Sequence, residues 1–418
     1  MDASVDLTTA EAAALRRKSL TAVILSCFGV GIAFGLGYPL TAMALEARGE
    51  PAWVIGLAGA APSLAILVLL PILPHAVARI RPATAIIFGC TCCAAAYGSL
   101  YFLDNSAAWI ALRFIMGATI ALPWIVGETW VNHIAGDTHR ARVISFYAVS
   151  FFSGFALGPI LLEHVGVTGP WAFAIGAMGA FLAAVPIYLA RDFAPDLAHE
   201  PATGLLGGMR MAPAAMAGAF LGGFLETSHF ALLPNVAMAG GMDEGAALRL
   251  LTALIVGGLV TQYALGWLAD RMSRKRILIS LGILYAVLIV AFPWVLARPE
   301  LAPALIFVLG TSVIGFYMLG LAMLGQEVEP SQLATANAAF ILMYTTGGIV
   351  GPVISGAAMT QAPLSGFVAV TAVASLLLTA VMMIAGRRGR TSGRRGETGP
   401  QSLGNRPAWA TRVRRDPA

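Results

Sequence analysis

The sequence predicts an all-α integral membrane protein with twelve transmembrane helices in two pseudo-symmetric six-helix halves. Hydrophobic residues make up 58% of the chain and charged residues 11%, and the mean hydropathy is +0.80. A soluble domain has roughly 25% charged residues. Apolar stretches close to the ~20 residues that cross hydrocarbon as a helix recur along the chain. A set of landmarks also repeats at a fixed spacing. These three observations together predict the fold class.

The apolar stretches form two groups. A polar leader at 1–19 precedes the first half, 20–190, and a linker rich in Pro, Ala and Gly at 191–211 separates it from the second half, 212–386. The six stretches of the first half are 20–42, 53–73, 83–103, 107–132, 143–163 and 171–190. The six of the second half are 212–236, 246–268, 277–297, 301–324, 334–357 and 366–386. The basic tail, 387–418, has no apolar period, so we expect it to be disordered.

Arginine and lysine set the orientation of these elements. With both termini inside, 22 of the 26 basic residues lie on the cytoplasmic side, and without the tail 13 do so against three outside. The positive-inside rule therefore predicts cytoplasmic termini. Tryptophans mark the expected membrane interfaces, with Trp53, Trp109, Trp171 and Trp294 at outer ends and Trp130 and Trp267 at inner ends. The pI of 9.2 thus reflects topology and does not favour a nucleic-acid partner.

Two lysines against 24 arginines suggest a GC-rich bacterial genome, so we expect the bacterial inner membrane.

Landmarks of the two halves recur at an offset of 193 residues. The segment Arg113–Ile160 aligns on Ile306–Val353 without a gap. The alignment pairs Phe114 with Phe307, Gly117 with Gly310, Gly127 with Gly320, Gly154 with Gly347, and Gly158-Pro159 with Gly351-Pro352. Two similar bundles of membrane helices with a site between them are typical of transporters that rock about a shared midplane site. The repeat therefore predicts a transporter.

A charged turn follows the second span of the second half. It reads Gly266-Trp-Leu-Ala-Asp270-Arg271-Met-Ser-Arg274-Lys275-Arg276, and it resembles the signature loop of the major facilitator superfamily, G-x-L-a-D-R-x-G-R-[KR]-[KR]. The resemblance covers essentially the whole membrane portion. It implies that Gly266, Asp270, Arg271 and Arg274 belong to a cytoplasmic gating loop that latches the outward-open state.

The first half departs from this pattern at the equivalent turn. Residues 74–81 have Ala78 where the family has Asp, which puts a first-half latch in doubt. Ser273 is a milder departure, since it replaces a Gly of the second-half loop. The runs RFIMGATIALPWIVGETW, LVTQYALGWLADR and QLATANAAFILMYTTGGIVGP resemble the YcaD-type branch of bacterial facilitator transporters. That resemblance implies a fold and a class of activity, and names no substrate.

Two charged residues lie close to one stripe of the fourth span. Arg113-Phe-Ile-Met-Gly117 resembles the family's R-x-x-x-G element. A guanidinium inside the membrane is costly unless it faces a polar cavity or a partner, so for Arg113 cavity function and structural packing both stay open. Glu128 lies near the inner end, within reach of arginines of the adjoining turns. The candidate partners of Glu128 are Arg79, Arg140 and Arg142. We favour a structural latch for Glu128 over substrate contact.

Small residues and prolines recur in the fifth and eleventh spans, as Gly154-x-x-x-Gly158-Pro159 and Gly347-x-x-x-Gly351-Pro352. Small residues one turn apart let helices approach closely, and Pro bends a helix. The first copy resembles the antiporter element of drug exporters, although Leu161 and Leu162 stand where glycines should follow. Its presence in both halves favours packing over a link to antiport.

Glu226 and His229 lie three residues apart, deep in the seventh span. On a helix this spacing puts both on one face. Charged groups at this depth are rare and usually functional, and His titrates near neutrality. The pair is therefore a candidate proton site, with a polar lining that bonds to a neighbouring helix as the alternative.

These features predict a secondary transporter of a small solute that works by alternating access. Proton-coupled export of an amphipathic or drug-like compound is our first hypothesis, and proton-coupled uptake of a metabolite is the second. A non-transporting signalling or scaffold protein of the same fold is a third. We expect the partners to be a small-molecule substrate, protons and the lipid bilayer, and the protein to be a monomer. We expect no enzyme activity and no cofactor or metal, since no nucleophile set, P-loop or metal cluster is found in the sequence.

Overall fold

The computed structural model describes residues 9–69, 80–135, 140–193, 208–209, 211–298 and 300–392. The first-half turn with Ala78 and the tail beyond Ser392 lie outside the described residues. So do most of the predicted linker and the side chains of Arg79 and Arg140.

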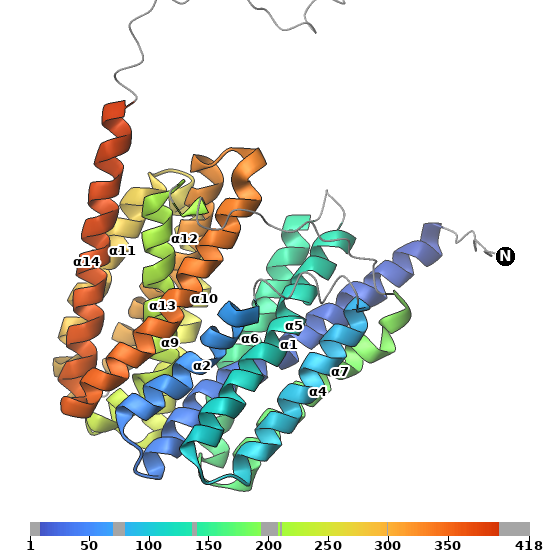
Figure 1. The fold of residues 1–418 in the computed structure, drawn as a ribbon, viewed down its shortest axis with the longest axis horizontal. Helices are drawn as coiled ribbons and strands as arrows, with labels where there is room; N and C mark the ends of the chain where they lie inside the picture. Colours follow the sequence, from blue (N-terminus) through green and yellow to red (C-terminus); the bar gives the residue numbers. More distant parts are fainter. Residues whose placement is uncertain are drawn as a thin grey trace, which may run out of the picture.

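The described chain is almost entirely helical and contains twelve α-helices (Figure 1). The helices of the first half are α1 (Thr9–Ala47), α2 (Ala52–Leu69), α4 (Pro82–Tyr101), α5 (Ser106–Ile134), α6 (Arg140–Val165) and α7 (Pro170–Leu189). Those of the second half are α9 (Pro213–Ala239), α10 (Glu244–Ala269), α11 (Arg274–Leu296), α12 (Ala302–Glu327), α13 (Leu333–Gln361) and α14 (Pro363–Ser392). Two short 3₁₀ turns, η1 (Arg191–Phe193) and η2 (Pro330–Gln332), complete the elements. Each predicted span corresponds to one helix, so the predicted fold class is confirmed.

Two helices extend past their predicted bounds. Helix α1 starts at Thr9, inside the predicted leader, and α14 continues to Ser392, inside the predicted tail. Both extensions are polar, and hydropathy marks only the part of a helix that lies in hydrocarbon. A polar continuation of the same helix is therefore missed by an apolar pattern.

Helix ends follow from local capping residues. The Asn105 side chain accepts a hydrogen bond of 2.8 Å from the Ala107 amide at the start of α5. Asp243 does the same for α10, where it accepts from the Ala246 amide at 2.9 Å. This hydrogen bond holds the pKa of Asp243 below its ordinary value. Caps of this kind satisfy N–H groups that the first turn of a helix leaves free.

Eleven of the described helices are long and apolar enough to cross a membrane by length and composition. The twelfth, α9, is also long, but its polar run Glu226-Thr-Ser-His229 lowers its hydropathy. Nearly every residue of α9 is buried against other helices. A helix that is covered on all sides by protein does not need an apolar face for lipid. Helix α9 is therefore a central element of the second half.

Glycines allow the closest helix contacts in both halves. A methyl group on Gly154 or Gly158 of α6 would collide with the backbone of α1 at Phe28 or Gly35. At the equivalent places in the second half, a methyl group on Gly347 or Gly351 of α13 would collide with the α9 carbonyls of Phe220 and Phe224. Pro159 and Pro352 lie inside these same helices. The repeat in the sequence thus corresponds to the same close approach made twice, α6 on α1 and α13 on α9.

The two halves meet at one end of the molecule and diverge toward the other. In Figure 1 they converge where α2 and α13 lie side by side, and they separate toward the end at which α14 finishes. At the convergent end Gly56 of α2 lies against the Pro352 carbonyl of α13, and the Trp53 amide donates to Thr360 Oγ1 at 3.1 Å. With the cytoplasmic termini that the positive-inside rule predicts, this end would be the outer one and the arrangement would be inward-facing.

Candidate functional site

The carboxylate of Glu226 lies in the middle of α9, on the side that faces the other half. Its residue is partly exposed, whereas its neighbours Leu225 and Thr227 are buried. The side chain makes a hydrogen bond with Tyr344 of α13, and Tyr38 of α1 lies within electrostatic range. Glu226 thus connects the core of the second half with the interface between the halves.

Aromatic side chains of both halves pack in two groups, and Tyr38, Tyr317 and Tyr344 are the members that interact with Glu226. We call the two groups together the central aromatic cluster, and it consists of Phe34, Tyr38, Trp124, Phe151, Phe155, Phe230, Tyr317, Phe340 and Tyr344. Ring centroids of Phe155 and Phe230 lie 4.7 Å apart across the two halves, and those of Tyr317 and Tyr344 lie 4.9 Å apart. Trp124 is 37% exposed, whereas Phe155 and Phe340 are buried. Such a cluster suits the apolar body of a small organic molecule.

Arg113 of α5 lies beside this cluster and is almost fully buried, with 4% of its surface exposed. Its guanidinium carbon lies 4.7 Å from the centre of the Tyr38 ring. The Nε and Nη2 atoms have no hydrogen-bond partner. Arg113 lines a small cavity with Phe34, Tyr38 and Tyr97, among others. All residues that line this cavity belong to the first half, so the structure places Arg113 at a cavity inside that half, beside Tyr38.

His229 does not share surroundings with Glu226. Its side chain is fully buried, with Nδ1 at 2.6 Å from the Leu225 carbonyl and Nε2 at 3.3 Å from Tyr285 Oη of α11. Its ring also packs edge-on against Phe367 of α14, with centroids 5.1 Å apart. The two side chains therefore have separate partners, and the geometry favours a packing role for His229 inside the second half.

Glu128 lies near the C-terminal end of α5 and is exposed. Its side chain makes a hydrogen bond with Trp124, one turn earlier. Among the ion pairs between described residues none involves Glu128. Of its three candidate partners, Arg142 lies in the part with described side chains and the other two do not. Glu128 thus hydrogen-bonds within α5, and it lies within electrostatic range of Tyr147 of α6 and Tyr317 of α12.

The gating loop makes its described contacts within the second half. Arg271 stacks on the Trp267 ring at 3.8 Å, and Arg274 Nη1 donates to the Ala322 carbonyl of α12. Asp270 caps the end of α10 and is exposed, and Gly266 has open space beside it. A latch of the outward-open state would be disengaged in an inward-facing arrangement, so these contacts are compatible with the predicted role.

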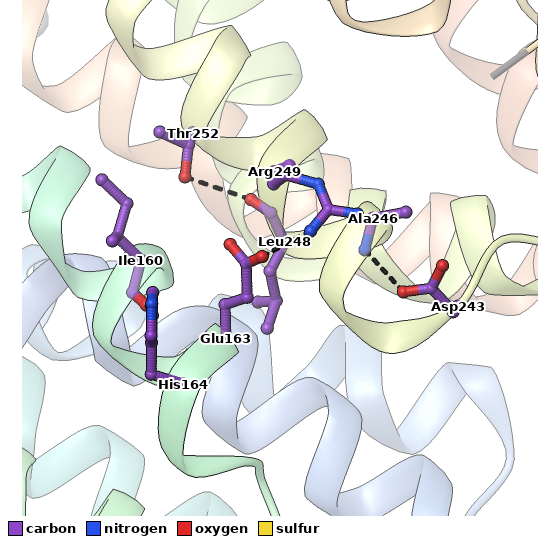
Figure 2. A network of polar contacts seen from close by, with 8 residues as sticks. All are labelled: Ile160, Glu163, His164, Asp243, Ala246, Leu248, Arg249 and Thr252. Atoms are coloured by element: carbon purple, nitrogen blue, oxygen red, sulfur yellow. Dashed lines mark hydrogen bonds and ion pairs between the residues drawn. The ribbon is translucent and has the colours of Figure 1, made fainter. Parts of the chain in front are cut away.

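Charged residues at the convergent end join the two halves, and sequence reasoning missed them. Figure 2 shows Arg249 of α10 paired with Glu163 of α6. Nearby, Asn235 Nδ2 donates to Glu46 at 2.6 Å and to the Ala42 carbonyl at 3.2 Å. Charges of opposite sign at the outer ends of the fifth and eighth spans are visible in the sequence. Their pairing is not visible, because it depends on which helix ends approach across the halves.

Comparison with known proteins identifies the family to which this chain belongs. The sequence model described as Major Facilitator Superfamily matches residues 19–295 and 215–417, which together span nearly the whole chain. The chain belongs to the major facilitator superfamily. It is therefore a membrane transporter, as the repeat and the gating loop predicted.

Relatives of this facilitator transporter have the same general description. It is 24% identical over 332 residues to YfkF of Bacillus subtilis (strain 168), across 78% of this chain and 85% of YfkF. It is 26% identical over 290 residues to YcaD of Escherichia coli O7:K1, across 68% of this chain and 73% of YcaD. Both are described as uncharacterized MFS-type transporters. The predicted resemblance to the YcaD-type branch is confirmed.

Solved structures show the same fold at low sequence identity. The nucleoside transporter NupG superposes with a TM-score of 0.72 at 16% identity, over 89% of this facilitator chain and 98% of NupG. A bacterial homologue of the human lysosomal transporter Spinster, in an inward-facing and unoccupied conformation, superposes with a TM-score of 0.71 at 13% identity. That match covers 89% of this chain and 97% of the homologue.

Proposed function

We propose that this facilitator transporter exports a small amphipathic, drug-like solute across the bacterial inner membrane by alternating access, in exchange for protons. In this proposal it acts as a monomer with both termini in the cytoplasm, and it has no nucleic-acid partner. The observation that carries the proposal is the partly exposed carboxylate of Glu226, in the middle of a buried helix at the interface between the halves.

A carboxylate in this position suits proton exchange. A carboxyl group keeps its proton in a dehydrated site and releases it at neutral pH where it contacts water. Rocking of the two halves would expose Glu226 to one side and then to the other. Its hydrogen bond with Tyr344 of α13 ties the carboxylate to a helix that packs on the first half through α2. Protonation is thereby linked to the contact between the halves.

The substrate class follows from the central aromatic cluster. Its nine rings form an apolar region in which Phe155 and Phe340 are buried and Trp124 is exposed, and few charges lie beside it. Aromatic lining with a few polar groups favours molecules with an apolar body and a small polar end. In the proposed topology the divergent end is the cytoplasmic side, from which the solute would enter. When the inner ends close, the gating loop with Asp270 and Arg271 would engage the first half.

The test is transport by purified protein in proteoliposomes with an imposed pH gradient. Ethidium, dansylglycine and dansylglycinamide serve as fluorescent probes that are cationic, anionic and neutral. We expect wild-type protein to move at least one of them against its gradient toward the acidic compartment. Glu226→Gln should abolish this accumulation, because an amide cannot carry the proton, while exchange without a gradient persists.

Glu300→Gln is the matched control, since Glu300 is exposed in a turn at the convergent end. It should transport like wild type. Full gradient-driven accumulation in Glu226→Gln would remove this carboxylate from the mechanism. Movement of probe only out of the acidic compartment would overturn export and favour uptake.

A further inference from the structure

We propose that Arg113 is the anion subsite of the transport site and takes the carboxylate of an amphipathic monoanion. This inference rests on the proposed function, because it names the charge class of the solute that the proposed transporter would carry. It assigns the apolar body of the ligand to the rings beside Arg113 and its charged end to the guanidinium.

The first observation is the uncompensated charge of Arg113. The residue is 4% exposed, and its Nε and Nη2 atoms have no hydrogen-bond partner. None of the ion pairs between described residues includes it. Buried charges in membrane helices are normally paired or face a water-filled space. A guanidinium left with two free donors is therefore suited to a partner that arrives from outside the protein.

The second observation is which donors are free. Nε and Nη2 form one edge of the guanidinium group, and this edge presents two parallel N–H bonds. A carboxylate binds such an edge through both of its oxygens. The Tyr38 ring, 4.7 Å from the guanidinium carbon, holds the cation by its π face without using either N–H. The contact that holds Arg113 in place thus leaves the carboxylate-binding edge free.

The third observation is a small cavity that Arg113 helps to line. Its volume is about 10 Å³ and its lining includes Ala33, Phe34, Tyr38 and Cys93. That is roughly the space for one water molecule, or for one oxygen of a bound group. Phe34 and Tyr38 belong both to the cavity lining and to the central aromatic cluster. A ligand that places its oxygen at Arg113 would therefore place its apolar part over the cluster.

The backbone beside Arg113 is shaped for this arrangement. Gly37 of α1 lies so close that a methyl group on it would be 2.8 Å from Arg113 Nη1 and 2.5 Å from Tyr97 Oη. Any larger residue at position 37 would push the guanidinium or the tyrosine aside. Because Gly37 has no side chain, the guanidinium of Arg113 has room to lie in its observed position. This steric requirement does not depend on the charge of Arg113.

The charges nearby favour a monoanion. Arg113 is the cation that Tyr38 faces, and the carboxylate of Glu226 lies within electrostatic range of the same ring. A second negative charge on the ligand would meet Glu226 with no further cation to balance it. A carboxylate with an aromatic or aliphatic body fits both the single cation and the aromatic surface.

The test compares two probes that differ only in this charge, dansylglycine and dansylglycinamide. Binding to the purified full chain in nanodiscs is followed by dansyl fluorescence, without a pH gradient. We expect wild-type protein to bind the carboxylate at least tenfold more tightly than the amide. Arg113→Gln should bring the two affinities together. Arg113→Lys should keep a reduced preference, since an ammonium group is a point charge without the paired edge.

Two further variants distinguish a role of Arg113 in carboxylate binding from a general effect on folding. Gly37→Ala keeps the charge but crowds the guanidinium, so it should also lose the preference. Arg48→Gln is the matched control, because Arg48 also stacks on an aromatic ring, Trp109 at 4.4 Å, but lies at the outer turn. It should bind both probes like wild type. Each variant is first checked for an unchanged melting temperature and a single size-exclusion peak.

Equal binding of the two probes by wild-type protein would overturn the proposal, as would weak binding of both. An undiminished preference in Arg113→Gln would also overturn it. Failure of the anion subsite and failure of the proposed proton coupling can be told apart, because the binding experiment uses no pH gradient and the transport experiment does. Glu226→Gln should retain the carboxylate preference even though it loses proton-driven accumulation.

Discussion

At the residue scale, polar groups inside this membrane protein differ in what they face. Glu226 faces the interface between the halves, Arg113 faces a cavity inside the first half, and His229 is enclosed by Tyr285 and Phe367 in the second half. The sequence identified all three, because a charged or titratable residue is conspicuous in an apolar span. It could not separate them, because spacing along one helix does not say which neighbouring helix covers each face.

The enclosed position of His229 predicts a structural effect of its removal. His229→Ala should lower the melting temperature, since it leaves a hole between α11 and α14 and removes the contact with Tyr285. Hydrogen bonds of this kind in membrane proteins contribute about 0.6–1.7 kcal/mol. The pH dependence of proton-driven transport should stay as in wild type. Thermal unfolding in detergent and transport at several pH values check the two parts.

A shifted pH dependence with unchanged stability in His229→Ala would contradict this account and return His229 to the coupling site. His164→Ala provides the comparison, because His164 is a histidine at the outer end of α6 that bonds only to its own helix at Ile160. It should leave both stability and transport unchanged.

At the element scale, the sequence predicted the helices well and their contacts only in part. Apolar length determines each span, so all twelve were found, and the errors lie at the polar extensions of α1 and α14. Glycine pairs suggested close packing in α6 and α13 but did not name the partner helices. The partners, α1 and α9, are set by the way the six helices of each half close on one another, which hydropathy does not encode.

The close contacts predict that larger residues in the glycine pair of α6 and in that of α13 destabilise the protein to a similar extent. Gly158→Leu and Gly351→Leu should each destabilise the protein by about 1–3 kcal/mol, because an added side chain forces two backbones apart. Gly98→Leu should be nearly neutral, since nothing lies within 4 Å of a methyl group there. Chemical or thermal unfolding of the three variants in the same detergent gives the comparison. A loss of stability as large in Gly98→Leu would show that bulk alone is responsible.

At the scale of the whole molecule, the convergent end is closed by the packing of α2 on α13 and by polar contacts between the halves. The Glu163–Arg249 pair is partly exposed, with 23% and 57% of the side chains accessible. Partly exposed ion pairs contribute about 0.2–1 kcal/mol and weaken in salt. An ion pair of this strength adds to the helix packing without locking the end closed, which alternating access requires. The sequence predicted two halves that rock, but the contacts that hold them depend on pairs far apart in the chain.

Weakening this closure should open the convergent end. In a background without the four native cysteines, Ala42→Cys reports on it, because Ala42 is 2% exposed at the outer end of α1. Arg249→Gln should raise its labelling by an impermeant maleimide up to about fivefold, as loss of at most ~1 kcal/mol permits. High salt should act in the same direction. Arg298→Gln, at an exposed turn, should not change the rate, and an unchanged rate in Arg249→Gln would mean that the pair does not hold the end closed.

The enclosed polar helix α9 has a consequence for how the protein is made. During synthesis each segment must leave the translocon for lipid, and a charged residue at a helix centre costs about 2.5–3.5 kcal/mol in that step. Glu226 lies near the centre of α9, which is the long helix outside the set apolar enough to span on its own. Helix α9 should therefore wait at the translocon until a later helix shields it. Fused into a reporter protein with glycosylation sites on both sides, α9 alone should insert poorly, whereas α9 with Glu226→Leu, or α9 followed by α10, should insert efficiently. Residues that serve transport in the finished protein would thus make the second half assemble as a unit, after the first half is already in the membrane.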